Sequence, residues 1–277
     1  MSLRFTKMHG IGNDFVVLDR RDAISPLSAE LARKLADRHV GIGCDQVMTI
    51  ERSEKATSRF RYGIYNADGS VAGQCGNGLR CVVRWLADRG LVHGQGIRLI
   101  GPSGPAVADL LDDGRVRVDM GIPRFDAVDV PLATTMTLPR YALELDGQRI
   151  EFGAVSMGNP HALIEVTAID AAPVALLGQR IEIHAFFPDR VNVGFAQVVD
   201  RSHVRLRVFE RGVGETLACG SGACAAVVVL RTWDRVDADV RVQLPGGELQ
   251  ISWPGAGHSV TMTGPATTVF EGEWNDD

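Results

Sequence analysis

The sequence predicts an α+β fold built from two pseudo-symmetric halves, each a mostly antiparallel sheet around a central helix. Three observations support this expectation. Residues that alternate between apolar and polar dominate the chain, as in half-buried strands. Two apolar helical segments each follow a Cys-Gly-x-Gly sequence, one in each half. At 277 residues the chain also exceeds the usual size of one domain.

The two Cys-Gly-x-Gly sequences belong to a longer internal repeat. One cysteine is Cys75 and the other is Cys219. The residues that precede the two cysteines at similar distances are Asn13 and Asn159 (62 and 60 residues before), Gln46 and Asn192 (29 and 27), and Asn66 and Glu210 (9 and 9). Because these landmarks keep their order and nearly their spacing, the chain is interpreted as one duplicated unit.

The first half is expected to contain two helices and several strands. Ser25-Pro26 supplies a cap and a first-turn proline for a helix over 27–37. Alternation predicts a strand over 59–65. Apolar residues at helical spacing predict a helix over 77–89, which ends at Gly90. A strand over 116–121 follows the turn sequence Asp112-Asp113-Gly114.

The second half repeats this pattern. Strands are expected over 204–209, 240–244 and 260–264, with turns at 146–147 and 245–247. The segment 222–233 is apolar on nearly every face, so a helix there must be enclosed by other elements. The domain break is expected near Pro123, which gives domains 1–122 and 123–264. The tail 265–277 is expected to rejoin the first half.

Composition excludes several classes of function. A net charge of −5 and a pI near 5.8 leave no basic surplus for nucleic acid. No apolar run is long enough for a membrane span, and Met1–Lys7 contains no signal-peptide hydrophobic region. We therefore expect a cytoplasmic protein that binds neither nucleic acid nor membrane. Five cysteines, an odd number, favour reduced thiols over a disulfide framework.

Cys75 and Cys219 are the strongest candidates for chemistry. A cysteine at a helix N-terminus faces backbone N–H groups and the positive end of the helix dipole, so we expect both environments to favour the thiolate. Cys44, Cys81 and Cys224 are expected to be small buried apolar residues. The cysteine spacing matches neither a zinc site nor a Cys-x-x-Cys redox motif, so no metal is expected.

The remaining candidates are polar residues beside turns or strand ends. Turn asparagines are common for backbone reasons alone, so a turn position by itself does not assign any of them a function. Glu210-Arg211 suits a zwitterionic ligand. The amides of Gly76-Asn77 and Gly220-Ser221 could hold a carboxylate, whereas no nucleotide-binding motif occurs. Pyridoxal phosphate requires a Schiff-base lysine, and Lys7, Lys34 (helix) and Lys55 (polar turn) lack such a context.

The motifs taken together resemble the diaminopimelate epimerase family over nearly the whole chain. Those that carry the resemblance are Lys7-Met8-His9-Gly10-Ile11-Gly12-Asn13-Asp14-Phe15, Cys75-Gly76-Asn77-Gly78-Leu79-Arg80-Cys81, Gly158-Asn159-Pro160-His161, Glu210-Arg211-Gly212-Val213-Gly214-Glu215-Thr216 and Cys219-Gly220-Ser221-Gly222-Ala223. The resemblance implies two pseudo-symmetric β-barrel-like domains with the site between them. It also implies interconversion of LL- and meso-diaminopimelate in lysine and peptidoglycan precursor biosynthesis, without cofactor or metal.

The resemblance also implies roles for individual residues. Cys75 and Cys219 would be the acid and base, and His161 and Glu210 would tune the thiols. The residues implied to contact substrate are Asn13, Gln46, Asn66, Gly76, Asn77, Asn159, Asn192, Glu210, Arg211, Gly220 and Ser221. A homodimer is implied as well, although Phe270 stands where the family often has a tyrosine linked to dimerisation.

Two like residues on opposite faces of one carbon also fit the chemistry of inversion, in which one takes a proton and the other gives one. The sequence leaves open which cysteine is the base for which stereoisomer. A proline or hydroxyproline racemase is the nearest alternative enzyme, and a phenazine-type isomerase would lack the paired cysteines. A ligand-binding module or a thiol redox sensor, in which Cys75 and Cys219 form a disulfide, is the alternative from another class.

Overall fold

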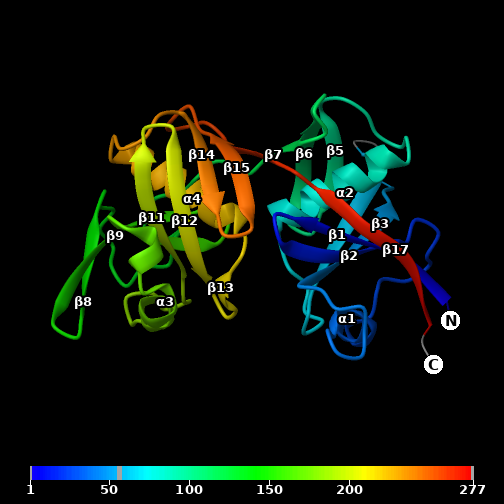
Figure 1. Cartoon of the computed structure of the whole chain (residues 1–277), viewed down its shortest axis with the longest axis horizontal. Coiled ribbons are helices and arrows are strands. Elements are labelled where there is room, and N and C mark those ends of the chain that lie inside the picture. The colour runs from blue at the N-terminus through cyan, green and yellow to red at the C-terminus, as the bar shows by residue number, and fades with distance from the viewer. Residues whose placement is uncertain (1, 55–57, 276–277) are drawn as a thin grey trace. The chain divides into compact units, whose positions relative to one another are not determined.

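The computed structural model describes residues 2–54 and 58–275 and divides into two compact units (Figure 1). Unit 1 comprises Met1–Asp119 with Thr263–Asp277, and unit 2 comprises Met120–Met262. The C-terminal segment thus belongs to the first unit. Lys55, expected in a polar turn, lies outside the described residues.

In its described residues, unit 1 is a mixed sheet with two helices. Its elements are β1 (Ser2–Gly10), β2 (Asn13–Asp19), α1 (Ala29–Ala36), β3 (Gln46–Arg52), β4 (Phe60–Asn66), α2 (Gly76–Asp88), β5 (Ile97–Gly101), β6 (Gly104–Leu110), β7 (Val116–Asp119) and β17 (Thr267–Asn275). Along β17-β1-β2-β3-β4-β5-β6-β7, the pairs β2–β3 and β4–β5 are parallel and the others antiparallel.

Unit 2 repeats this alternation of pairings. Its elements are β8 (Tyr141–Leu145), β9 (Gln148–Ser156), β10 (Pro160–Glu165), a 3-10 turn (Ile169–Ala171), α3 (Val174–Glu182), β11 (Asn192–Asp200), β12 (His203–Glu210), β13 (Gly214–Thr216), α4 (Gly220–Thr232), β14 (Asp239–Leu244) and β15 (Gly247–Ser252), and β16 (Thr261–Gly264) spans the boundary between the units. Along β9-β10-β11-β12-β14-β15, the pairs β10–β11 and β12–β14 are parallel and the others antiparallel. The pseudo-symmetric α+β prediction is therefore confirmed.

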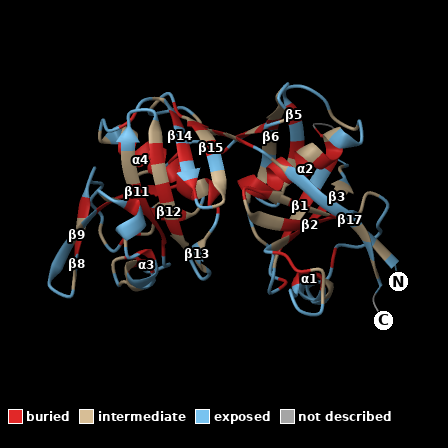
Figure 2. Ribbon diagram, viewed as in Figure 1, coloured by how far each residue is buried: buried red, intermediate tan, exposed pale blue. Residues whose placement is uncertain are grey.

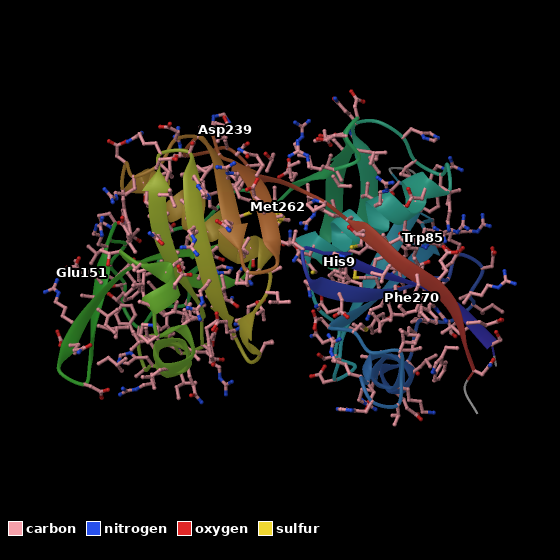
Figure 3. The ribbon with its side chains drawn as sticks, viewed as in Figure 1. His9, Trp85, Glu151, Asp239, Met262 and Phe270 are labelled. Atoms are coloured by element: carbon pink, nitrogen blue, oxygen red, sulfur yellow. The ribbon has the colours of Figure 1, made fainter. Side chains whose placement is uncertain are left out.

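The central helices α2 and α4 are the most enclosed elements (Figure 2). Almost every residue of α4 up to Leu230 is buried, as the all-round apolar sequence predicts. Strand β9 approaches α4 so closely that a Cβ on Gly153 would lie 2.3 Å from Val229. In unit 1, Trp85, labelled in Figure 3, lies on α2. Its indole N–H donates to Thr6 on β1 at 2.9 Å, which holds the helix against the sheet.

Two details of the helices differ from expectation. The first helix begins at Ala29, and its cap is Ser28, whose Oγ accepts the Leu31 N–H at 3.1 Å; the prediction of a Ser25-Pro26 cap was wrong. Helix α3 was not expected from the sequence. No helix in the described residues is long and apolar enough to cross a membrane.

Candidate active site

Cys75 is the N-cap residue of α2 and points its sulfur at the first turn. Its backbone is extended, with φ −147° and ψ 104°, and Sγ accepts the Gly78 N–H at 3.4 Å. A Cβ on Gly78 would lie 2.8 Å from the flexible end of the Met48 side chain. The amides of Gly76 and Asn77 occupy the same first turn, whose N–H groups have no intrahelical acceptor. Sulfur and backbone donors therefore share one helix end.

Asn13 brings the start of β2 to this helix end. Its Oδ1 accepts from Asn77 Nδ2 at 3.3 Å and lies 3.9 Å from the Cys75 sulfur. Its Nδ2 donates to Asp45 at 2.8 Å. The turn before Asn13 requires left-handed backbone, with Gly12 at φ 90°, and Gly158 before Asn159 has the same φ. The two repeated asparagines thus follow matching turns.

Gln46 and Asn66 form a second polar pair in unit 1. They are direct partners in the β3–β4 register, and Gln46 Nε2 donates to Asn66 Oδ1 at 2.8 Å. Gln46 also pairs with Phe15 of β2 across the parallel ladder, so this pair lies along the strand ends near Asn13. The structure thus brings the predicted candidates of the first half to one region of the sheet.

Cys219 is the N-cap residue of α4, as Cys75 is of α2, but its surroundings disfavour the thiolate. Burial raises the pKa of Cys219 well above its ordinary value, and the negative charge of Glu210 raises the pKa further. Ser221 opposes the shift through a hydrogen bond. The prediction that both helix ends favour a thiolate was therefore wrong for Cys219, because burial and a carboxylate outweigh the helix end. Cys219 rests as a thiol.

Ser221 connects Cys219 to a buried histidine. Ser221 Oγ lies 3.7 Å from the Cys219 sulfur and 3.1 Å from His161 Nε2. His161 Nε2 also contacts Asn159 Oδ1 at 3.0 Å, and Asn159 Nδ2 donates to Ser221 at 3.3 Å. Burial, and secondarily the charge of Arg211, lowers the pKa of His161 to about 3. The imidazole is therefore neutral, and its influence on Cys219 passes through Ser221.

Glu210 ends β12 and faces the cysteine helix of unit 2. The carboxylate accepts a hydrogen bond from Thr216 at 2.5 Å and from the Cys219 thiol. The β12–β13 register pairs Glu210 with Gly214, so the intervening hairpin turn holds it in place. Glu210 and His161 thus both act on Cys219, the first directly and the second through Ser221.

Asn192 is buried, whereas the side chain of Arg211 is exposed. Asn192 is 3% exposed, and its amide joins two backbone segments: Nδ2 donates to Pro160 O at 2.8 Å, and Oδ1 accepts from the Arg211 N–H at 3.0 Å. The Arg211 side chain is exposed, and Nη1 donates to Asp189 O at 3.0 Å. Asn192 therefore shapes the turn that carries Arg211.

Sequence reasoning missed two residues of this region. Asp45 binds Asn13, and the buried Glu182 accepts the Gly212 N–H at 2.6 Å beside Arg211. Asp45 directly precedes the candidate Gln46, which is the one signal that could have identified it. Glu182 lies at the end of the unpredicted helix α3, so the sequence offered no signal for it.

The other cysteines and Lys7 have structural surroundings. Cys44, Cys81 and Cys224 are buried and form no disulfide, and burial raises the pKa of both Cys44 and Cys81 to about 12. Within residues 2–54 and 58–275, no group of three or more His, Cys, Asp or Glu side chains could hold a metal ion. Lys7 forms an ion pair with Asp14 at 2.6 Å.

Comparison with solved structures shows proteins of the same fold. The hydroxyproline epimerase from Agrobacterium vitis gives a TM-score of 0.69 at 18% identity, with 98% of this chain and 92% of that chain covered. A PhzF-family phenazine biosynthesis protein from Bacillus anthracis gives 0.70 at 14% identity, with full coverage of both chains. At these identities the comparison establishes the two-domain, barrel-like fold.

Comparison of sequences is more specific. The family model described as diaminopimelate epimerase matches residues 5–125 and 153–269. A diaminopimelate epimerase from Xanthomonas euvesicatoria is 58% identical over 274 residues, which cover 99% of this chain and 96% of that protein. One from Aromatoleum aromaticum is 52% identical over the full length of both chains. The chain therefore belongs to the diaminopimelate epimerase family.

Proposed function

We propose that this protein interconverts LL-diaminopimelate and meso-diaminopimelate by proton transfer at one α-carbon, without pyridoxal phosphate or a metal. The observation that carries the proposal is the pair of cysteines at matching helix N-termini, each among the polar residues of its own unit. The choice of substrate is supported by relatives named diaminopimelate epimerase that are 58% and 52% identical to this chain.

In the proposed mechanism, one cysteine acts as base and the other as acid. A thiolate removes the α-proton from one face, the electron pair stays on the α-carbon and its carboxylate, and the second thiol delivers its proton to the opposite face. The sulfurs then exchange protonation states, so the reverse reaction uses the same groups. Because Cys219 rests as a thiol, we propose that Cys75 is the base in the resting enzyme.

The α-proton of an amino acid is a weak acid, so the carbanion must be stabilised. We propose that the backbone amides of Gly76, Asn77, Gly220 and Ser221 bind the α-carboxylate and stabilise the charge that develops on it. Their location in the first turns of α2 and α4 supports this role, because N–H groups there point out of the helix end.

We propose that the remaining polar residues bind the substrate's second amino-acid head. Its ammonium group suits the oxygens of Asn66 and Glu210, and its carboxylate suits Arg211. The exposed guanidinium of Arg211 is available to a ligand. Asn192 contributes by holding the backbone of Arg211, and Asn13, Gln46 and Asn159 complete the polar set. A proline-type substrate has no second head, which is why we prefer diaminopimelate.

The deciding experiment incubates the protein with LL-diaminopimelate in D2O under reducing conditions. We expect conversion to the meso isomer with solvent deuterium at one α-carbon. Proline and 4-hydroxyproline, tested in parallel, should show no exchange. Absence of exchange with diaminopimelate would reject the proposed function. Exchange with proline alone would instead support the alternative, a proline racemase.

We further propose that the protein works in the cytoplasm as a homodimer. The second copy would bind at β17, where Val269 is 55% and Phe270 48% exposed, and Phe270 packs edge-on against Phe5 at 5.8 Å. Phe270→Glu should convert the dimer to a monomer in light-scattering measurements. A monomeric unmodified protein would reject this part of the proposal.

A further inference from the structure

Asp45 fixes the orientation of the Asn13 side-chain amide. Its Oδ2 accepts from Asn13 Nδ2 at 2.8 Å and from the backbone N–H of Asp14 at 3.1 Å. An ionised carboxylate only accepts hydrogen bonds, so the NH2 end of the Asn13 amide must face Asp45. The carbonyl end therefore points the other way, toward α2.

The carbonyl end of this amide faces Cys75. Asn13 Oδ1 accepts from Asn77 Nδ2 at 3.3 Å and lies 3.9 Å from the Cys75 sulfur. A carbonyl oxygen accepts a hydrogen bond from a thiol but repels a thiolate, whereas an amide NH2 would donate to a thiolate. The direction of one amide thus decides which protonation state of Cys75 it stabilises.

Asp45 is itself held by basic residues. Arg38 donates to Asp45 Oδ1 at 2.7 Å and to Asp14 at 2.7 Å, and Lys7 pairs with Asp14 at 2.6 Å. Although burial opposes the shift, the hydrogen bonds from Arg38 and Lys7 lower the pKa of Asp14 to about 2. Asn13 connects this charged cluster to the Cys75 sulfur, because it contacts both Asp45 and Cys75.

The repeated asparagine of unit 2 presents its opposite end. Asn159 Oδ1 can only accept, so at 3.0 Å it fixes His161 in the tautomer with a proton on Nε2. Asn159 Nδ2 then donates to Ser221, beside Cys219. The acceptor Asp45 in unit 1 and the donor His161 in unit 2 thus turn two equivalent amides in opposite directions.

We propose that Asp45 is a positioning residue that keeps the carbonyl oxygen of Asn13, rather than its NH2 group, toward Cys75. Its role is to prevent Cys75 from being held as an over-stabilised, weakly basic thiolate. The proposal rests on the proposed function only in treating Cys75 as a reacting group.

The test compares the rate at which iodoacetamide alkylates Cys75 at neutral pH in the unmodified protein and in its variants. Mass spectrometry of the peptide that contains Cys75 measures this rate. Asp45→Asn offers both an oxygen and an NH2 group to Asn13, so the amide can reverse and donate to the sulfur. We expect alkylation to accelerate roughly three- to tenfold, the range that corresponds to one hydrogen bond. Asp45→Glu, which keeps an acceptor-only group, should restore a rate near that of the unmodified protein.

Two controls separate positioning from simple loss of charge. In an Asn13→Ala background, Asp45→Asn should change the rate by less than about twofold, because no amide remains to reverse. Asp19→Asn, which removes an Arg21-paired carboxylate from the far end of β2, should have no effect. An unchanged rate in Asp45→Asn, or the same acceleration without Asn13, would overturn the proposal. The readout needs no substrate, so failure of the D2O experiment would leave it standing.

Discussion

The carboxylate of Glu210 accepts a hydrogen bond from the thiol of Cys219. Burial raises the pKa of that thiol well above its ordinary range, and the charge of Glu210 raises it further. The corresponding position in unit 1 is Asn66, a neutral residue whose Oδ1 accepts a hydrogen bond from Gln46 Nε2 at 2.8 Å. The two cysteines therefore share a helix position and differ in the charge beside them. This difference helps to keep Cys219 protonated in the resting protein, whereas the neutral Asn66 adds no such charge beside Cys75.

Glu210→Gln should lower the pKa of Cys219, because it removes the negative charge while burial remains. We expect faster alkylation of Cys219 at neutral pH and a loss of epimerisation of roughly 10²-fold or more, since an acid–base group would be mistuned. Glu215→Gln, which removes an Arg207-paired carboxylate of the neighbouring strand, is the matched control and should alkylate normally. Equal alkylation of Cys219 in both variants would show that Glu210 does not tune it.

Cys75→Ala and Cys219→Ala should each reduce epimerisation by about 10²- to 10⁴-fold, because the inversion needs a proton donor and an acceptor on opposite faces. Initial rates from LL- and from meso-diaminopimelate measure the loss in both directions. Cys224→Ala removes another thiol of α4, inside the core, and should reduce stability by roughly 1 kcal/mol without abolishing turnover. Near-normal rates in either Cys75→Ala or Cys219→Ala would exclude the two-cysteine mechanism.

Most of the fold could be predicted because its signals are local. The all-apolar sequence of α4 required burial, and strict alternation identified β12 and β14. Helix α3 was missed because its cap residue, Pro173, offers no side-chain acceptor and because Gly178 interrupts it. That glycine is needed for packing, since a Cβ would lie 2.5 Å from Phe209, and such a contact between distant segments leaves no local signal.

The site shows the same division. The repeat identified both cysteines and the two asparagines Asn13 and Asn159, because each lies next to a glycine-containing sequence that recurs in both halves of the chain. The raised pKa of Cys219 depends on how deeply the folded chain buries it and on Glu210, which comes from another strand. Likewise, the roles of Asp45 and Glu182 depend on hydrogen bonds to residues 32 and 30 positions away. Periodicity and motifs contain no information on such contacts.

His161 should make the protein sensitive to acid. Its pKa is about 3 when folded and near 6.5 when unfolded, so the unfolded chain binds the proton first as pH falls. The stabilisation that depends on a neutral His161 is therefore fully present above pH 6.5. Below that pH the free energy of unfolding decreases, by at most about 1.4 kcal/mol per pH unit. Asp14, with a folded pKa of about 2, adds a loss only below about pH 4. Between about pH 6.5 and 4.5, the expected loss of stability therefore comes from His161 and not from Asp14.

Urea unfolding across that window tests this expectation. His161→Gln keeps a donor for Asn159 and has no titrating group, so its free energy of unfolding should vary less with pH than that of the unmodified protein. His93→Gln, an exposed histidine, is the matched control and should retain the original slope. If His161→Gln loses stability on acidification as steeply as the unmodified protein, the neutral buried imidazole is not the source of acid sensitivity.

Adding one methyl group at the last glycine of each Cys-Gly-x-Gly sequence should distinguish the two helix ends. In Gly78→Ala the new Cβ meets the flexible end of Met48 at 2.8 Å, which can move aside. In Gly222→Ala it meets Val208 at 3.0 Å and the Cys219 sulfur at 3.1 Å. Both variants gain helix propensity of roughly 1 kcal/mol, which offsets part of the strain. We therefore expect similar melting temperatures but a much larger loss of epimerisation in Gly222→Ala, because only there is a reacting sulfur displaced. Equal losses of activity in the two variants would contradict this difference in packing.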